Sequence, residues 1–336
     1  MTGVIGVGHL GYHHARILGR ITGGAVPVYD ASPERASFVA SELPVTVCDG
    51  LERLLGSCRN VVVACTTSAH HEVVLAALEA GCNVLVEKPI AATEAQGEEM
   101  VAAAARRGLV LAVGHVERFN PAVLAAAGLI GAPLFVEGHR MAPFRPRGID
   151  VSVVMDLMIH DIDLILAVVR TPVARVDAVG VSVLSGSIDI ANARLSFEGG
   201  CVANVTASRV SREKVRKIRF FQRDAYVSVD CSRPLALVFR KKDVSEDALL
   251  AIARGEVAGG LNSIVDYEEL PMDPTEPLTL EQASFVRAVR DGCRPEVDGE
   301  DGLKALEVAL EILRQIGAHH DAGLPGASGG AARRPA

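Results

Sequence analysis

Three side chains have the types and the spacing that proton transfer from a hydroxyl group requires. Lys88 follows an apolar segment and precedes Pro89, and Asp156 and His160 stand four residues apart. Side chains four apart share one face of a helix, and histidine is the natural acid or base at neutral pH. Burial at the end of a strand is expected to lower the pKa of Lys88, so that it can help a hydroxyl lose its proton. We therefore expect Lys88, Asp156 and His160 to be catalytic.

Each of these residues also has a plainer interpretation. Lys88 can be a solvated surface group, and Asp156, His160, Asp161 and Asp163 can form a helix face with caps and ion pairs. An acidic cluster beside a histidine also suggests a metal site. Because Lys88 would compete with a cation there, we expect no metal. Asp161 and Asp163 are expected to support the helix and a contact between domains.

A glycine-rich motif at the start of the chain predicts a dinucleotide site. The pattern G-x-G-x-x-G follows a short apolar run, and the residues expected at the phosphates are Gly6, Gly8, His9, Leu10 and Gly11. Such glycines allow a tight turn, a close approach of the pyrophosphate and close packing of the next helix. The first N–H groups of that helix bind phosphate.

Asp30 bears on which dinucleotide is bound. It ends the next apolar segment, about twenty residues after the glycines, where an acid binds the ribose diol. A carboxylate accepts hydrogen bonds from a free 2′-hydroxyl and repels a 2′-phosphate, so NAD is favoured over NADP. Arg35 could swing back towards this point, but it is more simply a solvated helix residue. The alternative is a structural turn with Asp30 as a helix cap.

Residues 1–118 alternate between strand and helix patterns, which predicts a doubly wound parallel sheet of the Rossmann type and an α/β fold. Residues 119–320 form mostly consecutive strands, which predicts an α+β domain with a large open, mostly antiparallel sheet. Helices are expected over 151–169, 280–291 and 302–317. An open sheet needs cover on its second face, so we expect a homo-oligomer. Residues 321–336 lack periodicity and are expected to be disordered.

Composition excludes several classes of protein. The net charge of −7 argues against a nucleic-acid surface. No apolar segment reaches the roughly 18 residues of a membrane helix, and the N-terminus lacks the basic region of a signal peptide. The seven cysteines are scattered without metal-binding spacing, as expected for small core residues in a reducing compartment. We therefore expect a cytoplasmic protein.

Four segments together resemble the Gfo/Idh/MocA family of oxidoreductases: the glycine motif, Glu87-Lys88-Pro89, residues 114–121 and residues 156–163. The resemblance implies an NAD-dependent dehydrogenase that oxidises a sugar ring hydroxyl, with His160 as the proton acceptor and Lys88 assisting. It also implies that the cofactor lies near Thr66, His71, Glu87 and Lys88. Thr67 replaces the proline of the family's T-P-x-x-x-H segment.

Two features resemble the nucleotide-sugar branch of that family. Residues 115–121 read H-V-E-R-F-N-P, and the loop before the expected catalytic helix, around 148–150, is poor in glycine, with Met158 where relatives have a glycine. The resemblance implies oxidation of the 3-hydroxyl of UDP-N-acetylglucosamine, on the way to a 3-amino sugar of lipid A. An inositol, a free sugar or another nucleotide sugar remains an alternative, as does a protein that senses NAD without turnover.

A nucleotide sugar carries phosphates, which need cations or N–H donors. Arg118 and Asn120 fall at the expected domain junction, and Arg209 begins the only dense basic run, which ends at Arg223. We expect these three residues to bind substrate together with Lys88, Asp156 and His160. The run as a whole is otherwise a solvated edge that discourages strand pairing.

Overall fold

The computed structural model describes residues 1–144, 151–242, 250–251, 254 and 265–323. The loop expected to shape the substrate pocket, 148–150, lies outside the described residues. The last helix continues to Gly323, so residues 321–323 of the expected disordered tail are helical, and residues 324–336 lie outside the described part.

The first domain is a six-stranded parallel sheet with strand order β3-β2-β1-β4-β5-β6, in agreement with the predicted Rossmann fold. Short runs rich in valine form these strands because both faces of a doubly wound sheet are buried. The strands are β1 (Thr2–Ile5), β2 (Val26–Tyr29), β3 (Val45–Val47), β4 (Asn60–Val63), β5 (Asn83–Glu87) and β6 (Leu111–Gly114).

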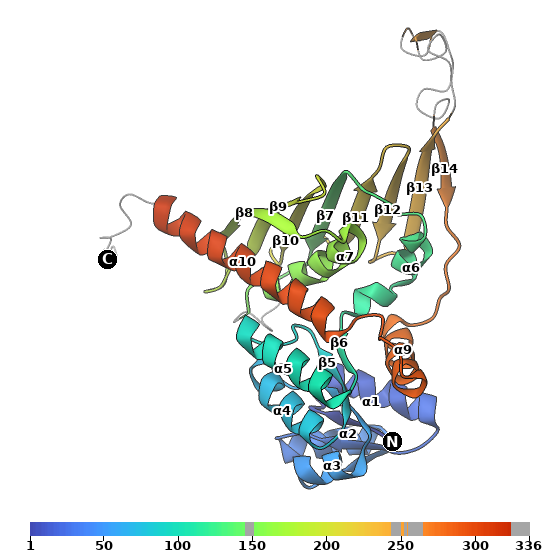
Figure 1. Cartoon of the computed structure of the whole chain (residues 1–336), viewed down its shortest axis with the longest axis vertical. Helices are drawn as coiled ribbons and strands as arrows, with labels where there is room; N and C mark the ends of the chain where they lie inside the picture. Colours follow the sequence, from blue (N-terminus) through green and yellow to red (C-terminus); the bar gives the residue numbers. More distant parts are fainter. Residues whose placement is uncertain (145–150, 243–249, 252–253, 255–264, 324–336) are drawn as a thin grey trace, which may run out of the picture.

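Helices cover both faces of this sheet (Figure 1). One face packs on α3 (Leu51–Ser57), α4 (Thr67–Glu79) and α5 (Glu94–Arg107). The other face packs on α1 (His9–Thr22), α2 (Pro33–Glu42) and α9 (Pro277–Asp291). Phe285 of α9 is buried in this second core, so a segment near the end of the chain returns to the first domain.

The second domain is an eight-stranded sheet with strand order β14-β13-β12-β11-β7-β10-β9-β8. Only β7 and β10 run parallel, so the sheet is mostly antiparallel, as predicted. Its strands are β7 (Phe135–Met141), β8 (Val173–Val181), β9 (Ile190–Phe197), β10 (Val202–Ser208), β11 (Val215–Phe221), β12 (Ala225–Asp230), β13 (Leu235–Lys241) and β14 (Val265–Glu269).

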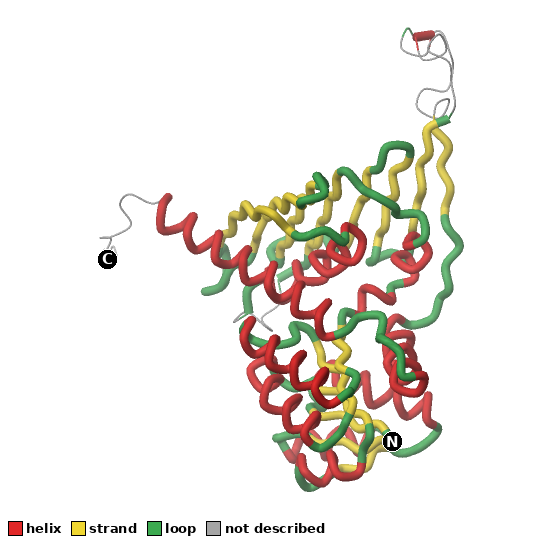
Figure 2. The backbone as a smooth tube through the Cα atoms, in the orientation of Figure 1, coloured by secondary structure: helices red, strands yellow, loops and turns green. Residues whose placement is uncertain are grey.

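Helices α6 (Pro121–Ala127), α7 (Ile159–Val169) and α10 (Gly299–Gly323) pack on one face of this sheet and enclose its core. Figure 2 shows α10 as a long helix that runs across the sheet and reaches the first domain. The 3-10 helix η1 (Val116–Phe119) joins the domains, and a π-helical turn, η2 (Val154–Met158), precedes α7. No described helix is long and apolar enough to span a membrane.

Candidate active site

Lys88 lies at the carboxyl end of β5, where a cis peptide bond leads into Pro89. Its Nζ donates a hydrogen bond of 2.8 Å to the backbone carbonyl of Asp156 and lies 3.4 Å from the Asp156 carboxylate. The Asp156 side chain is 50 % exposed. The structure therefore brings Lys88 and Asp156 together at the edge of the Rossmann sheet where dinucleotide enzymes bind their ligands.

The element that carries Asp156 and His160 is not the single α-helix that the sequence predicted. A π-helical turn over Val154–Met158 precedes α7, and the wider turn changes how positions four apart are related. Among the described residues, no hydrogen bond joins Asp156 to His160, and Asp156 instead contacts Lys88. Such turns are frequent at functional sites.

His160 is held in its neutral form. Its side chain is half-buried, and its Nδ1 atom is buried without a hydrogen-bond partner among the described residues. Burial first, and then the positive charges of Lys88 and Arg140, hold the pKa of His160 well below its usual 6.5. The imidazole is therefore unprotonated at neutral pH and able to accept a proton from a hydroxyl group.

A buried ion-pair network fixes the helix beside His160. Arg140 of β7 is 2 % exposed and donates hydrogen bonds to Glu117 at 2.8 Å and to Asp161 at 2.6 and 3.0 Å. Burial alone would lower the pKa of Arg140, but the charges of Asp161 and Glu117 outweigh it and raise that pKa. The network ties β7, η1 and α7 together, which confirms the expected supporting role of Asp161.

Arg118 and Asn120 are engaged within the protein rather than directed to a substrate. Arg118 donates two hydrogen bonds, of 2.7 and 2.8 Å, to the buried carboxylate of Asp163, which confirms that Asp163 supports a contact between domains. Asn120 caps α6 and donates to Glu117 at 3.0 Å and to the Cys231 carbonyl at 3.1 Å. The Nε and Nη2 groups of Arg118 and the amide of Asn120 are thus bonded within the protein, at positions where substrate contacts were expected.

Arg209 is placed differently from its expected role as well. It is 6 % exposed, donates a hydrogen bond to the carbonyl of Val151 and lies 3.7 Å from the carboxylate of Asp189. Because Arg209 is buried between these partners, it stabilises the segment that leads into η2. The spacing of the basic run could not reveal this, because Asp189 comes from a distant loop.

Strand alternation divides the basic run between two faces of the sheet. Arg216 shares the helix-covered face of β11 with buried Ile218, and its half-exposed guanidinium donates to Glu117 at 3.1 Å. Arg219 lies on the open face and pairs with Glu137 at 2.7 Å. Arg216 is close enough to His160 for its charge to act on that imidazole. Arg216 belongs to the basic run, and alternation along the strand distinguishes it from its neighbours.

The glycine loop fits a dinucleotide. Gly6 has a φ of +82°, and a Cβ on Gly11 would lie 1.8 Å from the Gly6 carbonyl oxygen, so neither position accepts a side chain. A Cβ on Gly8 would meet nothing within 4 Å, which leaves the backbone open to a phosphate. Asp30 accepts a hydrogen bond of 2.7 Å from the N–H of Val7, which holds its carboxylate beside this loop, where a ribose diol can bind it.

Three other residues that were expected to bind the cofactor have exposed side chains. His9 and Leu10 are exposed at the start of α1, and Thr66 is exposed just before α4. Arg35 is not a solvated helix residue. Its guanidinium swings back and donates to two carbonyls of the glycine loop, at 2.7 and 3.0 Å. These two hydrogen bonds to the backbone carbonyls of Val7 and Gly8 stabilise the conformation of the loop.

His71 does not face the cofactor edge as expected, and its neighbour His70 lies closer to the end of the sheet. His71 pairs with Glu99 of α5 at 2.8 Å, so it faces the neighbouring helix instead of the cofactor edge. His70 is buried and lies 3.0 Å from the Pro89 carbonyl and 3.3 Å from the Cys65 carbonyl. The helix α4 begins at Thr67. With this start, the side chain of His70 points to the end of the sheet.

Glu87 points into the protein, which differs from its expected contact with the cofactor. It lies 2.8 Å from His14 of α1 and accepts a hydrogen bond of 3.2 Å from the backbone N–H of Lys88. Glu281 of α9 lies in the same buried cluster, where side-chain atoms of His14, Glu87 and Glu281 fall within 4.8 Å of one another. Burial, and then the charge of Glu87, raise the pKa of Glu281 well above its usual value.

We expect Glu281→Gln to stabilise the protein at alkaline pH. A carboxyl group whose pKa is raised by folding stabilises the native state below its unfolded pKa, near 4.5, and this contribution is lost as pH rises through the native pKa. The difference in Tm between variant and parent should therefore grow from pH 5 to pH 8, with exposed Glu72→Gln as the control. A difference independent of pH would contradict this account of the cluster.

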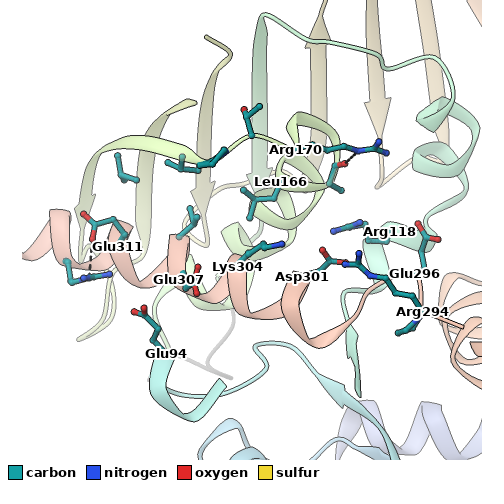
Figure 3. A pocket seen from close by; sticks show the side chains of 18 residues that line it. Glu94, Arg118, Leu166, Arg170, Arg294, Glu296, Asp301, Lys304, Glu307 and Glu311 are labelled. Atoms are coloured by element: carbon teal, nitrogen blue, oxygen red, sulfur yellow. Dashed lines mark hydrogen bonds and ion pairs between the residues drawn. The ribbon is translucent and has the colours of Figure 1, made fainter. Parts of the chain in front are cut away.

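A groove lined by the described residues lies apart from the candidate catalytic side chains. A cavity of about 1050 Å³ runs between α10, α7 and the start of β8, and Lys88, Asp156 and His160 do not line it (Figure 3). Its charged side chains are of both signs: Glu94, Arg118, Arg170, Arg294, Glu296, Asp301, Lys304, Glu307, Glu311 and Arg314. Because the charges balance, the groove offers no net attraction for a diphosphate.

Comparisons with known families match both domains. Residues 1–115 match the GFO_IDH_MocA oxidoreductase family with its NAD-binding Rossmann fold, and residues 123–228 match the GFO/IDH/MocA C-terminal domain. A UDP-N-acetylglucosamine 3-dehydrogenase of Acidithiobacillus ferrooxidans is 36 % identical over 93 % of this chain and 95 % of its own. An NAD(+)-dependent scyllo-inositol 2-dehydrogenase of Bacillus subtilis is 30 % identical over 62 % of this chain and 67 % of its own.

Solved structures agree with the sequence comparison. The UDP-N-acetylglucosamine 3-dehydrogenase GnnA from Acidithiobacillus ferrooxidans superposes with a TM-score of 0.85, at 34 % identity, over 94 % of this chain and 97 % of that one. A levoglucosan dehydrogenase in complex with NADH shares the fold, with a TM-score of 0.82 at 18 % identity over 94 % of this chain and 96 % of that one. The chain therefore belongs to the Gfo/Idh/MocA family and is an NAD-dependent sugar dehydrogenase.

Proposed function

We propose that this enzyme oxidises the 3-hydroxyl of UDP-N-acetylglucosamine to a ketone, as one step in making a 3-amino sugar for lipid A. The observation that carries the proposal is the 36 % identity over 93 % of the chain with a UDP-N-acetylglucosamine 3-dehydrogenase. An inositol or free-sugar substrate is the main alternative, since an inositol dehydrogenase is also a relative.

The proposed chemistry assigns a role to each of three side chains. Neutral His160 accepts the proton of the sugar hydroxyl, and Lys88 donates a hydrogen bond that orients the same oxygen. Asp156 holds the Lys88 ammonium at 3.4 Å and, half-exposed, can bind a second hydroxyl. Bound NAD supplies the hydride acceptor for the carbinol carbon. The products are the ketone, NADH and one proton.

The cofactor site of the proposal consists of the glycine loop, Asp30 and Thr66. We expect Asp30→Ala to reduce the ratio of kcat/KM for NAD to kcat/KM for NADP, because the carboxylate binds the ribose diol and repels a 2′-phosphate. Steady-state kinetics of both proteins with both cofactors measure this ratio. Equal use of the two cofactors by the parent enzyme would contradict the assigned role of Asp30.

Arg216 takes the place of Arg118, Asn120 and Arg209 as the proposed contact for the diphosphate. Its side chain is 37 % exposed on the helix-covered face of β11, where it pairs with Glu117, whereas Arg118, Asn120 and Arg209 are mostly buried against their protein partners. We expect Arg216→Ala to raise KM for UDP-N-acetylglucosamine about tenfold or more, as loss of a charge-assisted hydrogen bond implies, and to leave KM for NAD nearly unchanged. Arg219→Ala is the matched control, on the same strand and similarly exposed but on the open face. Equal effects of the two variants would remove Arg216 from the site.

A second copy of the chain is the proposed cover for the open face of the large sheet. Five aromatic rings form a ladder across this face, with neighbouring centroids 4.8–6.1 Å apart: Phe135, Phe221, Tyr226, Phe239 and Tyr267. Tyr267 is 66 % exposed. Sedimentation of the parent and of Tyr226→Ala tests the proposed homo-oligomer. We also propose that the protein is cytoplasmic.

A further inference from the structure

A second histidine stands behind His160. His115 follows β6 and is fully buried, and its ring lies edge-on to that of His160 with centroids 6.4 Å apart and an interplanar angle of 88°. Its Nδ1 lies 4.0 Å from a carboxylate oxygen of Asp163. His115 thus occupies the space between His160 and the buried ion pair of Asp163 with Arg118.

The ring nitrogens in this space lack protein partners. Both nitrogens of His115 and the Nδ1 of His160 are buried with no hydrogen bond to any described residue. Buried polar atoms are nearly always hydrogen-bonded, so three such atoms on two adjacent rings need an explanation. Catalytic hydrogen bonds are often long in the free enzyme and shorten when substrate binds.

We propose that His115 is a positioning residue for His160, and this inference rests on the proposed role of His160 as the base. In the substrate complex, His160 donates its Nδ1–H to His115 Nε2, and His115 donates its Nδ1–H to Asp163. Arg118 holds that carboxylate with two hydrogen bonds. The chain of donors fixes the His160 tautomer, so that Nε2 presents a lone pair to the sugar hydroxyl.

The charges around the two rings support this direction of hydrogen bonding. Burial lowers the pKa of His115, and Asp163 partly opposes that shift, with Arg118, Lys88 and Glu87 as the remaining charged neighbours. Lys88, Arg140 and Arg216 face His160. A neutral His115 can accept one hydrogen bond and donate another. When His160 takes the substrate proton, the carboxylate of Asp163 stabilises the new charge through His115.

The test compares His115→Phe, which keeps the ring shape without nitrogens, with His115→Gln, whose amide can both accept and donate. We expect kcat of His115→Phe to fall roughly 10–100-fold, at or below the lower end of what a positioned acid–base group contributes, while KM for NAD stays unchanged. His115→Gln should retain at least about tenfold more activity than His115→Phe. Exposed His319→Phe on α10 is the control and should keep the parental kcat.

A second measurement needs no turnover. Nitrogen NMR of histidine-labelled enzyme in the dead-end complex with NADH and UDP-N-acetylglucosamine, which cannot react, reports the His160 tautomer, identified by the signal that His160→Ala removes. The proposal predicts the Nδ1–H form in the parent and its loss in His115→Phe. The same tautomer in both proteins, or a His115→Gln variant no more active than His115→Phe, would overturn it. Failure of the substrate proposal is seen separately, as a parent enzyme that does not oxidise UDP-N-acetylglucosamine.

Discussion

Lys88→Ala and His160→Ala should each lower kcat by about 10²–10⁴-fold, the range that a positioned acid–base group contributes. NAD binding should survive both changes, because the glycine loop follows β1 and Asp30 follows β2, whereas Lys88 follows β5 and His160 lies on α7. Turnover of UDP-N-acetylglucosamine and the dissociation constant of NAD are the two measurements.

Lys217→Ala is the matched control for Lys88→Ala, since Lys217 lies on the open face of β11. It should keep the parental kcat. Near-parental activity in a correctly folded Lys88→Ala or His160→Ala variant would remove that residue from the catalytic pair.

Among changes that break ion pairs of the second domain, we expect Arg140→Ala to lower the free energy of unfolding most. It leaves the carboxylate of Asp161 buried without its partner and Glu117 paired with Arg216 alone, and breaking a buried pair in this way costs about 3–5 kcal/mol. Denaturant unfolding of parent and variant measures the change in the free energy of unfolding.

Arg175→Ala provides the comparison, because its pair with Asp177 is well exposed and such pairs contribute less than about 1 kcal/mol. Similar losses from Arg140→Ala and Arg175→Ala would mean that the buried network does not hold α7 in place.

The sequence predicted the fold because each local signal agreed with the global arrangement. Valine-rich runs, the glycine motif and the change to consecutive strands after residue 118 each correspond to an observed element. Several short features were not predicted, among them the three-residue strand β3, the edge strand β14, and the π-helical turn η2, whose sequence continues the apolar pattern of α7. The return of α9 to the first domain depends on packing across more than 150 residues, which periodicity cannot show.

The site was harder to predict wherever a charged residue has a partner far away in the chain. Motif position placed Lys88, Asp156 and His160 at one edge of the sheet, but it could not show that Arg118 is bound to Asp163 or that Arg209 lies beside Asp189. Nor could it show that Arg140, with no motif around it, pairs with Asp161. Alternation along β11 was available from the sequence and distinguishes Arg216 from Arg219.

The proposed reaction is tested most directly with UDP-N-acetylglucosamine that carries deuterium at C3 of the sugar. The enzyme is mixed with NAD at comparable concentration, and the reduced cofactor is analysed by mass spectrometry. Our account predicts NADH that carries one deuterium, because hydride leaves C3 of the substrate. Unlabelled NADH would place the oxidation at another carbon, and no NADH from this substrate, with turnover of a free sugar or an inositol, would contradict the proposed function.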